Sequence, residues 1–224
     1  MTHDSCWYQH VCNKPIEWGP CTNKCPRYTA MLSMFEHSNL PEKKWLPISL
    51  TPDDCDYDAF VRLSEIKSDI EQFVTTGSNL YICGRHAGNG KTSWAIKLLQ
   101  SYFNSIWDIV GGVNFCRGVF VHVPTYLLAV KNFNNFDANT RWLQQVLPEV
   151  DLVVFDDMAG AGVSQYDFTQ ILSIVDRRTL AEKSNIFTGN IVDRAVYDKN
   201  YGARLTSRVW DTSEIIELRG ASYR

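Results

Sequence analysis

The stretch NLYICGRHAGNGKTSWAIKLL, residues 79–99, decides the fold of this chain. It begins with a short apolar run typical of a buried strand and ends with apolar residues at helical spacing. The loop between them holds Gly88, Asn89, Gly90, Lys91, Thr92 and Ser93. In such a loop, glycines let backbone N–H groups approach phosphate oxygens, the lysine reaches the β- and γ-phosphates, and the threonine hydroxyl binds Mg²⁺. The N-terminus of the helix adds a partial positive charge, so the stretch predicts an ATP-binding site.

The loop departs from the usual spacing at its first glycine. The consensus has glycine five residues before Gly90, where this chain has Arg85, and Gly84 lies one residue further back. Either the loop carries an inserted residue, or Arg85 tolerates the first turn. The departure does not affect the residues that bind phosphate. It does leave open the alternative that the protein binds ATP without hydrolysing it.

Short apolar runs alternate with helical segments through the rest of the chain. The expected strands are 79–83, 118–123, 151–156, 185–189 and 214–218. The expected helices are 26–40, 58–77, 91–104, 124–131, 140–147, 164–181 and 202–210. Most of the strands are too apolar to be half exposed, as is typical of parallel strands buried on both faces. The alternation predicts an α/β fold: a three-layer P-loop ATPase domain with a five-stranded parallel sheet, in which ligands bind at the carboxyl ends of the strands.

Two strand ends supply further candidates for ATP hydrolysis. The run DLVVFDD ends in Asp156, which we expect to bind Mg²⁺ as the Walker-B acid, and Asp157, which is placed to orient or deprotonate the attacking water. Asn190 follows the run NIFTG and could position that water against the γ-phosphate. A turn or helix-capping asparagine is the alternative for Asn190.

A pair of arginines completes the candidate site. Arg204 and Arg208 lie four residues apart, and therefore on one face of a helix. Arginines in this position can act in trans on the ATP of a neighbouring subunit. A surface ion pair, with Glu214 or Asp211, is the alternative.

The bulk composition fits an ordinary globular protein of one domain with a small appendage. The chain has 224 residues, 45% of them hydrophobic, and a net charge of −3. Contacts with nucleic acid would therefore need a local basic patch. The opening MTHDSCWYQH has no apolar core of a signal peptide, and no apolar run is long enough to span a membrane. We expect a cytoplasmic protein.

Four of the seven cysteines fall within the first 25 residues. In a reducing compartment, clustered cysteines are more often metal ligands than disulfides, and so short a segment needs a staple to fold. We therefore predict a structural zinc site. Its ligands would be Cys6, Cys12, Cys21 and Cys25, with His3 or His10 able to replace one of them. Two disulfides or free thiols are the alternatives.

The composition also divides the chain into three parts. Residues 1–40 form the predicted zinc-binding module that docks on a partner, residues 41–57 read as a linker, and residues 58–224 form the ATPase domain. Two segments contain residues of the kind that bind single-stranded DNA. Segment 131–142 has basic and aromatic residues, and Arg177-Arg178 is a basic pair. An ordinary solvated helix face is the favoured interpretation of both.

From about residue 58 to 224, the chain resembles helicase-loader ATPases of the DnaC/DnaI type, a branch of the AAA+ class. The motifs GNGKT, LVVFDD, IFTGN, GARLTSRVW and the terminal GASYR carry the resemblance, in that order. The resemblance implies that Asn190 is sensor 1, Arg208 the arginine finger with Arg204 its neighbour, and Arg224 a sensor-2-like residue. The cysteine-rich leader resembles that of phage-encoded replication proteins of this type.

The function that this resemblance implies is an ATP-driven loader that delivers a replicative hexameric helicase onto single-stranded DNA. It also implies ATP or ADP with Mg²⁺ as ligands, self-assembly on ATP around the DNA, and docking of the N-terminal region on the helicase. Three alternatives stay open: a transposition helper ATPase of the IstB type, a non-hydrolysing adaptor, and a small-molecule P-loop kinase.

Overall fold

The computed structural model describes most of the chain. It covers residues 24–108, 116–131, 137–158 and 165–221 (backbone alone for 165–167), with Cys6, Tyr8, Gln9, Cys12, Cys21 and Thr22. The strands are β1 (Asn79–Cys83), β2 (Gly118–His122), β3 (Leu152–Asp156), β4 (Ser184–Gly189) and β5 (Ser213–Glu217). They form one sheet in the order β2-β3-β4-β1-β5, and every neighbouring pair is parallel. The predicted five-stranded parallel sheet is confirmed.

The helices agree with the predicted segments, with two differences. They are α1 (Pro26–Glu36), α2 (Tyr57–Ser68), α3 (Ile70–Thr75), α4 (Lys91–Ile106), α5 (Val123–Lys131), α6 (Ala138–Val146), α7 (Gln165–Leu180), α8 (Arg194–Tyr201) and α9 (Ala203–Val209). The helix expected over 58–77 is two helices, because the backbone leaves the helical region at Asp69. Helix α8 was not predicted, because its sequence is mostly polar and shows no clear apolar periodicity. The sequence does mark its start with the N-cap Asp193, whose carboxylate accepts a hydrogen bond from the Val196 N–H.

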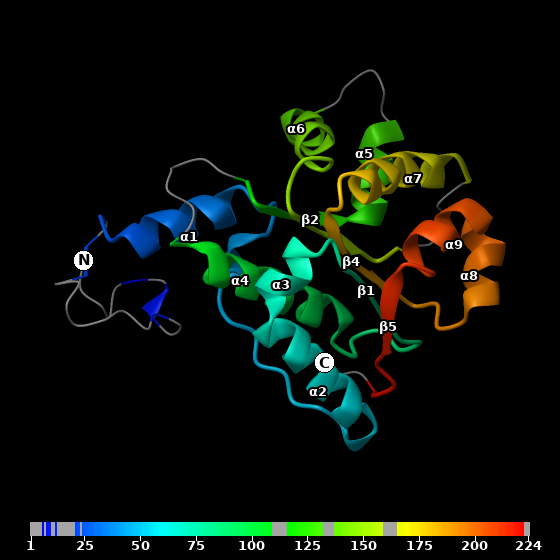
Figure 1. Cartoon of the computed structure of the whole chain (residues 1–224), viewed down its shortest axis with the longest axis horizontal. Coiled ribbons are helices and arrows are strands. Elements are labelled where there is room, and N and C mark those ends of the chain that lie inside the picture. Colours follow the sequence, from blue (N-terminus) through cyan, green and yellow to red (C-terminus); the bar gives the residue numbers. More distant parts are fainter. Residues whose placement is uncertain are drawn as a thin grey trace.

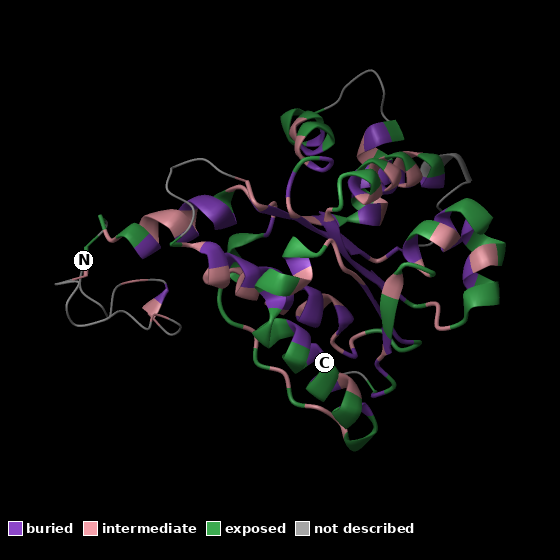
Figure 2. Ribbon diagram, viewed as in Figure 1, coloured by how far each residue is buried: buried purple, intermediate pink, exposed green. Residues whose placement is uncertain are grey.

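Helices cover both faces of the sheet, which confirms the three layers (Figure 1). Successive side chains of a strand point to opposite faces. In β1, Leu80 and Ile82 therefore pack in the core formed with α1 to α4, while Tyr81 and Cys83 pack in the core formed with α5 to α9. Figure 2 shows buried strands at the centre and exposed residues along the outer sides of the helices. No helix in the described part of the chain is long and apolar enough to cross a membrane.

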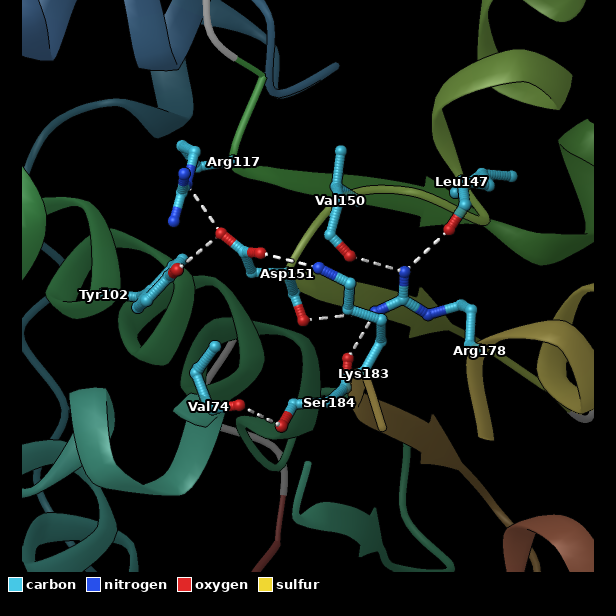
Figure 3. Close-up of polar contacts among 9 residues, drawn as sticks. All are labelled: Val74, Tyr102, Arg117, Leu147, Val150, Asp151, Arg178, Lys183 and Ser184. Carbon is cyan, nitrogen blue, oxygen red and sulfur yellow. Dashed lines mark hydrogen bonds and ion pairs between the residues drawn. The ribbon is translucent and has the colours of Figure 1, made fainter. Parts of the chain in front are cut away.

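Arg178 lies at the end of the sheet where β3 and β4 begin, which we call the amino edge, and it has no exposed surface. Figure 3 shows its contacts with Leu147, Val150 and Ser184. Its guanidinium donates to Asn185 Oδ1 and to four backbone carbonyl oxygens, those of Leu147, Val150, Asp151 and Ser184, at 2.6–3.3 Å. Burial lowers the pKa of Arg178 to about 9, so the group stays a cation at neutral pH. The solvated helix face expected for Arg177-Arg178 is thus wrong at Arg178, while Arg177 is an exposed ion-pair partner of Glu149.

Helix α1 packs directly on the α/β domain. Met31, Met34 and Phe35 lie in the same core as α4, and the Tyr8 hydroxyl donates to Asn104 Oδ1 on α4 at 2.8 Å. Arg27 donates to the same oxygen at 2.5 Å. The N-terminal residues that the structure describes are therefore attached to α4, and the division of the chain at residue 40 stays a prediction.

Candidate active site

The loop between β1 and α4 has the backbone of a phosphate-binding loop. Gly88 and Gly90 have φ angles of +82° and +98°, in the left-handed region that glycine adopts without steric cost. Gly90 is also the N-cap of α4, so the N-terminus of the 16-residue helix opens onto the loop. Such a terminus offers unpaired N–H groups and a partial positive charge to an anion.

The first glycine of the loop is Gly84, one residue earlier than the consensus spacing. A Cβ added at Gly84 would lie 2.2 Å from the Leu218 carbonyl oxygen and 2.4 Å from Asn89 Nδ2, so only glycine fits there. Arg85 is exposed and has no left-handed backbone. Of the two possibilities left open by the sequence, these contacts support a loop with one extra residue between Gly84 and Gly90. Asn89, which is wholly buried, donates to the Leu218 carbonyl at 2.8 Å and ties the loop to the end of β5.

The Lys91 ammonium lies over this loop. It donates to the carbonyl oxygens of Gly84 and His86 at 2.9 Å and to Asn89 Oδ1 at 2.8 Å, which uses all three of its protons. Burial lowers the pKa of Lys91, and the carboxylates of Asp157 and Asp156 oppose that shift. A strong anion such as phosphate could take the place of these neutral acceptors.

The acidic pair and the loop meet at the carboxyl edge of the sheet. Asp156, the last residue of β3, is 5% exposed. Its Oδ1 accepts hydrogen bonds from the hydroxyls of Thr92 and Thr188, each at 2.7 Å. The structure thus brings together the predicted Thr92 and Asp156. Thr188 was missed by the sequence analysis, although a hydroxyl near the end of an otherwise apolar strand was a signal.

Asp157 has an unusual backbone. Its φ is +57°, a conformation that non-glycine residues rarely adopt. Its N–H donates to Thr188 Oγ1 at 2.9 Å, and its side chain is 39% exposed. His122, at the end of β2, places Nε2 4.0 Å from Asp157 Oδ2 and is a second residue that the sequence analysis missed. Asn190 follows β4 at this same edge and is exposed.

The two arginines form an ion pair with a partner that the sequence analysis did not name. Arg204 Nη2 and Arg208 Nε lie 3.1 and 2.6 Å from the two carboxylate oxygens of Asp176 on α7. The partners considered earlier are engaged elsewhere, because Asp211 pairs with Arg194 and Glu214 with Arg62. Arg204 is 79% exposed, so neither its position nor its pairing is fixed by packing.

Arg208 lies near the amino end of β1, whereas the phosphate loop follows the carboxyl end of that strand. Thr212 donates to the Arg208 carbonyl at 2.6 Å and accepts from Asn79, the first residue of β1, at 3.4 Å. The phosphate loop follows Cys83, the last residue of β1. Strand β1 is five residues long, so roughly 13 Å separates its first residue, Asn79, from its last. Arg208 therefore lies far from the phosphate loop of its own chain.

The predicted zinc site does not form among the residues that the structure describes. There, no three His, Cys, Asp or Glu side chains are placed to share a metal ion, and all four leader cysteines are half-buried and form no disulfide. Cys6 and Cys12 pack against the core of α1 to α4 instead. His3, His10 and Arg224 lie outside the described residues.

The sheet order, the phosphate loop and the acidic pair define the fold of a P-loop ATPase domain of the AAA+ class. In this fold, β4 lies between β1, which leads into the phosphate loop, and β3, which ends in Asp156. Solved structures share this fold over most of the chain. The DnaC helicase loader matches with a TM-score of 0.64 and 19% identity, over 80% of this chain and 100% of that one. DnaI matches with a TM-score of 0.60 and 19% identity, over 83% and 94%. DnaA from Aquifex aeolicus, bound to AMPPCP, matches with a TM-score of 0.56 and 16% identity, over 76% and 48%.

No protein-family profile matches the sequence, and no curated protein sequence matches it. The likeness to the DnaC and DnaI helicase loaders therefore lies in the fold. It agrees with the order of motifs along the chain.

Proposed function

We propose that this protein hydrolyses ATP and uses the cycle to load a replicative helicase onto single-stranded DNA. The observation that carries the ATPase part is the contact of Thr92 with Asp156, which joins the phosphate loop to the acidic strand end at 2.7 Å. The loader part rests on the fold shared with the DnaC and DnaI loaders. On the same ground, the protein would act in the cytoplasm of a bacterium, and the cysteine-rich leader is the reason to consider a phage origin.

The residues present fit ATP with Mg²⁺. The loop N–H groups, the α4 N-terminus and Lys91 would bind the phosphates, and Thr92 and Asp156 offer the hard oxygen ligands that Mg²⁺ takes. The bound ion would neutralise charge that develops on the phosphate oxygens. Asp157, the more exposed carboxylate, would orient the attacking water and accept its proton, and Asn190 would hold that water against the γ-phosphate.

The remaining groups would act between molecules. Arg208, with Arg204 beside it, would reach the ATP of the next subunit in an ATP-dependent homo-oligomer that encloses single-stranded DNA. Asp176 would release Arg208 for this contact. The N-terminal region up to residue 40 would dock on the hexameric helicase, and the last residue, Arg224, would act as a sensor of the bound nucleotide.

The test is ATP hydrolysis by the purified protein with and without single-stranded DNA. We expect DNA to stimulate turnover in the wild type, and Lys91→Ala and Arg208→Ala each to lower it on the order of 10³-fold. Arg62→Ala, which removes an exposed arginine paired with Glu214 and Glu65, is the matched control and should keep its activity.

Mixing the two inactive variants decides whether Arg208 acts in trans. A Lys91→Ala subunit still carries the arginine, and an Arg208→Ala subunit still carries an intact phosphate loop. Their mixture should regain part of the activity that neither has alone. A mixture that stays inactive, or turnover indifferent to DNA and to Arg208, would favour the non-hydrolysing adaptor or a small-molecule kinase.

Zinc binding by the leader remains a separate hypothesis, supported by the cysteine spacing alone. It predicts about one zinc per chain in protein purified without chelator, lost when Cys21 and Cys25 are replaced by serine. Metal content measured by mass spectrometry decides it, and metal-free wild-type protein with four titratable leader thiols would exclude the site.

A further inference from the structure

Thr188 occupies the central place at the carboxyl edge of the sheet. It pairs with Ile82 of β1, and its strand β4 lies between the strand that leads into the phosphate loop and the strand that ends in Asp156. It is 1% exposed. A hydroxyl group buried to this degree needs hydrogen-bond partners, and the partners of the Thr188 hydroxyl are Asp156 and Asp157 in the acidic turn.

Three hydrogen bonds join Thr188 to three consecutive residues of that turn. Its hydroxyl donates to Asp156 Oδ1 at 2.7 Å and accepts from the Asp157 N–H at 2.9 Å. Its carbonyl accepts from the Met158 N–H at 2.8 Å. The hydroxyl has one proton to donate, and that proton goes to Asp156, so the direction of the two side-chain bonds is fixed.

These bonds account for the backbone of Asp157. A residue with φ of +57° persists in that conformation only when its surroundings hold it there. The Asp157 N–H is held by the Thr188 hydroxyl, and the next N–H is held by the Thr188 carbonyl. This turn sets the direction of the Asp157 side chain. Strand β4 lies between β3, which leads into the turn, and β1, which leads into the phosphate loop.

From this geometry we propose that Thr188 is the positioning residue of the active site, which fixes the direction of Asp157 and couples it to Asp156. The proposal rests on the proposed ATPase function. It differs from the role of Asn190, which lies exposed two residues further on and would contact the water itself. Thr188 is buried and acts through Asp157.

The test compares Thr188→Val with Thr188→Ser. Valine has the shape of threonine without the hydroxyl, and serine keeps the hydroxyl. We expect the valine variant to lose kcat on the order of 100-fold, the cost typical of a misplaced catalytic group, with ATP affinity changed only a few-fold. The serine variant should stay within a few-fold of the wild type. Thr179→Val, which removes a hydroxyl bonded only to its own helix at Val175 O, is the control for introducing valine.

Two results would overturn the proposal: a Thr188→Val variant with the kcat of the wild type, or serine and valine variants that lose activity equally. Amide hydrogen exchange supplies a readout that does not depend on turnover. The Asp157 N–H should exchange slowly in the wild type and in Thr188→Ser, and fast in Thr188→Val. If the wild type hydrolyses no ATP, the proposed function fails, whereas fast Asp157 exchange in the wild type would refute the role of Thr188 itself.

Discussion

Asp157→Asn should lower kcat for ATP hydrolysis by about 10²- to 10⁴-fold and leave ATP affinity within a few-fold, because it removes a general base and little else. Asparagine is the replacement that isolates the carboxylate. Asp157 has a left-handed backbone, which asparagine adopts at least as readily as aspartate, whereas alanine would add strain. The Asp157 N–H would still donate to Thr188 Oγ1.

The measurement is steady-state ATP turnover together with the binding of a fluorescent ATP analogue. Asp137→Asn is the matched control, because Asp137 caps α6 and asparagine caps a helix equally well. Unchanged turnover in Asp157→Asn would remove Asp157 from the reaction. His122, whose Nε2 lies 4.0 Å from Asp157 Oδ2, would then be the next group to test.

The phosphate loop could be predicted from the sequence because everything that defines it is local. Residues 84–92 contain the glycines, the lysine and the hydroxyl, and the strand before them and the helix after them are visible as apolar patterns. Even the displaced first glycine was visible, and the structure adds that a side chain at Gly84 would clash with Leu218 and Asn89. Asp156 was predictable for the same reason, since an apolar strand that ends in aspartate is a local signal.

The roles of Thr188 and Arg178 could not be predicted from the sequence, because these roles depend on which strands are neighbours. Thr188 matters because β4 lies between β1 and β3, and nothing in the order of segments along the chain gives that arrangement. Arg178 stands beside another arginine near the end of α7, where basic residues usually face water and the helix dipole. Its burial follows from the carbonyl groups that surround it at the start of β3 and β4.

Arg178→Ala should have the largest effect on stability of any single replacement considered for this chain, with a loss of about 4 kcal/mol or more in the free energy of unfolding. The guanidinium donates to three buried backbone carbonyl groups, to the partly buried carbonyl of Asp151 and to Asn185, and each buried acceptor left without a donor costs about 1–3 kcal/mol. Asp151 would also lose the nearest buried cation, although Lys183 and Arg117 still pair with it at 2.9 and 2.6 Å. Removing one member of a buried charged network typically costs about 3–5 kcal/mol.

The neighbouring arginine supplies the control, because Arg177 is exposed and pairs only with Glu149, at 3.3 Å, among the described residues. Arg177→Ala should change the free energy of unfolding by about 0.5 kcal/mol or less. Urea unfolding followed by circular dichroism compares the two variants with the wild type. A folded Arg178→Ala variant as stable as Arg177→Ala would contradict the buried position. If such a stable variant also lost single-stranded DNA binding, Arg178 would instead be an exposed residue that contacts DNA. A large loss of stability, confined to Arg178, would show that this arginine holds the amino edge of the sheet, which leaves the opposite edge for ATP.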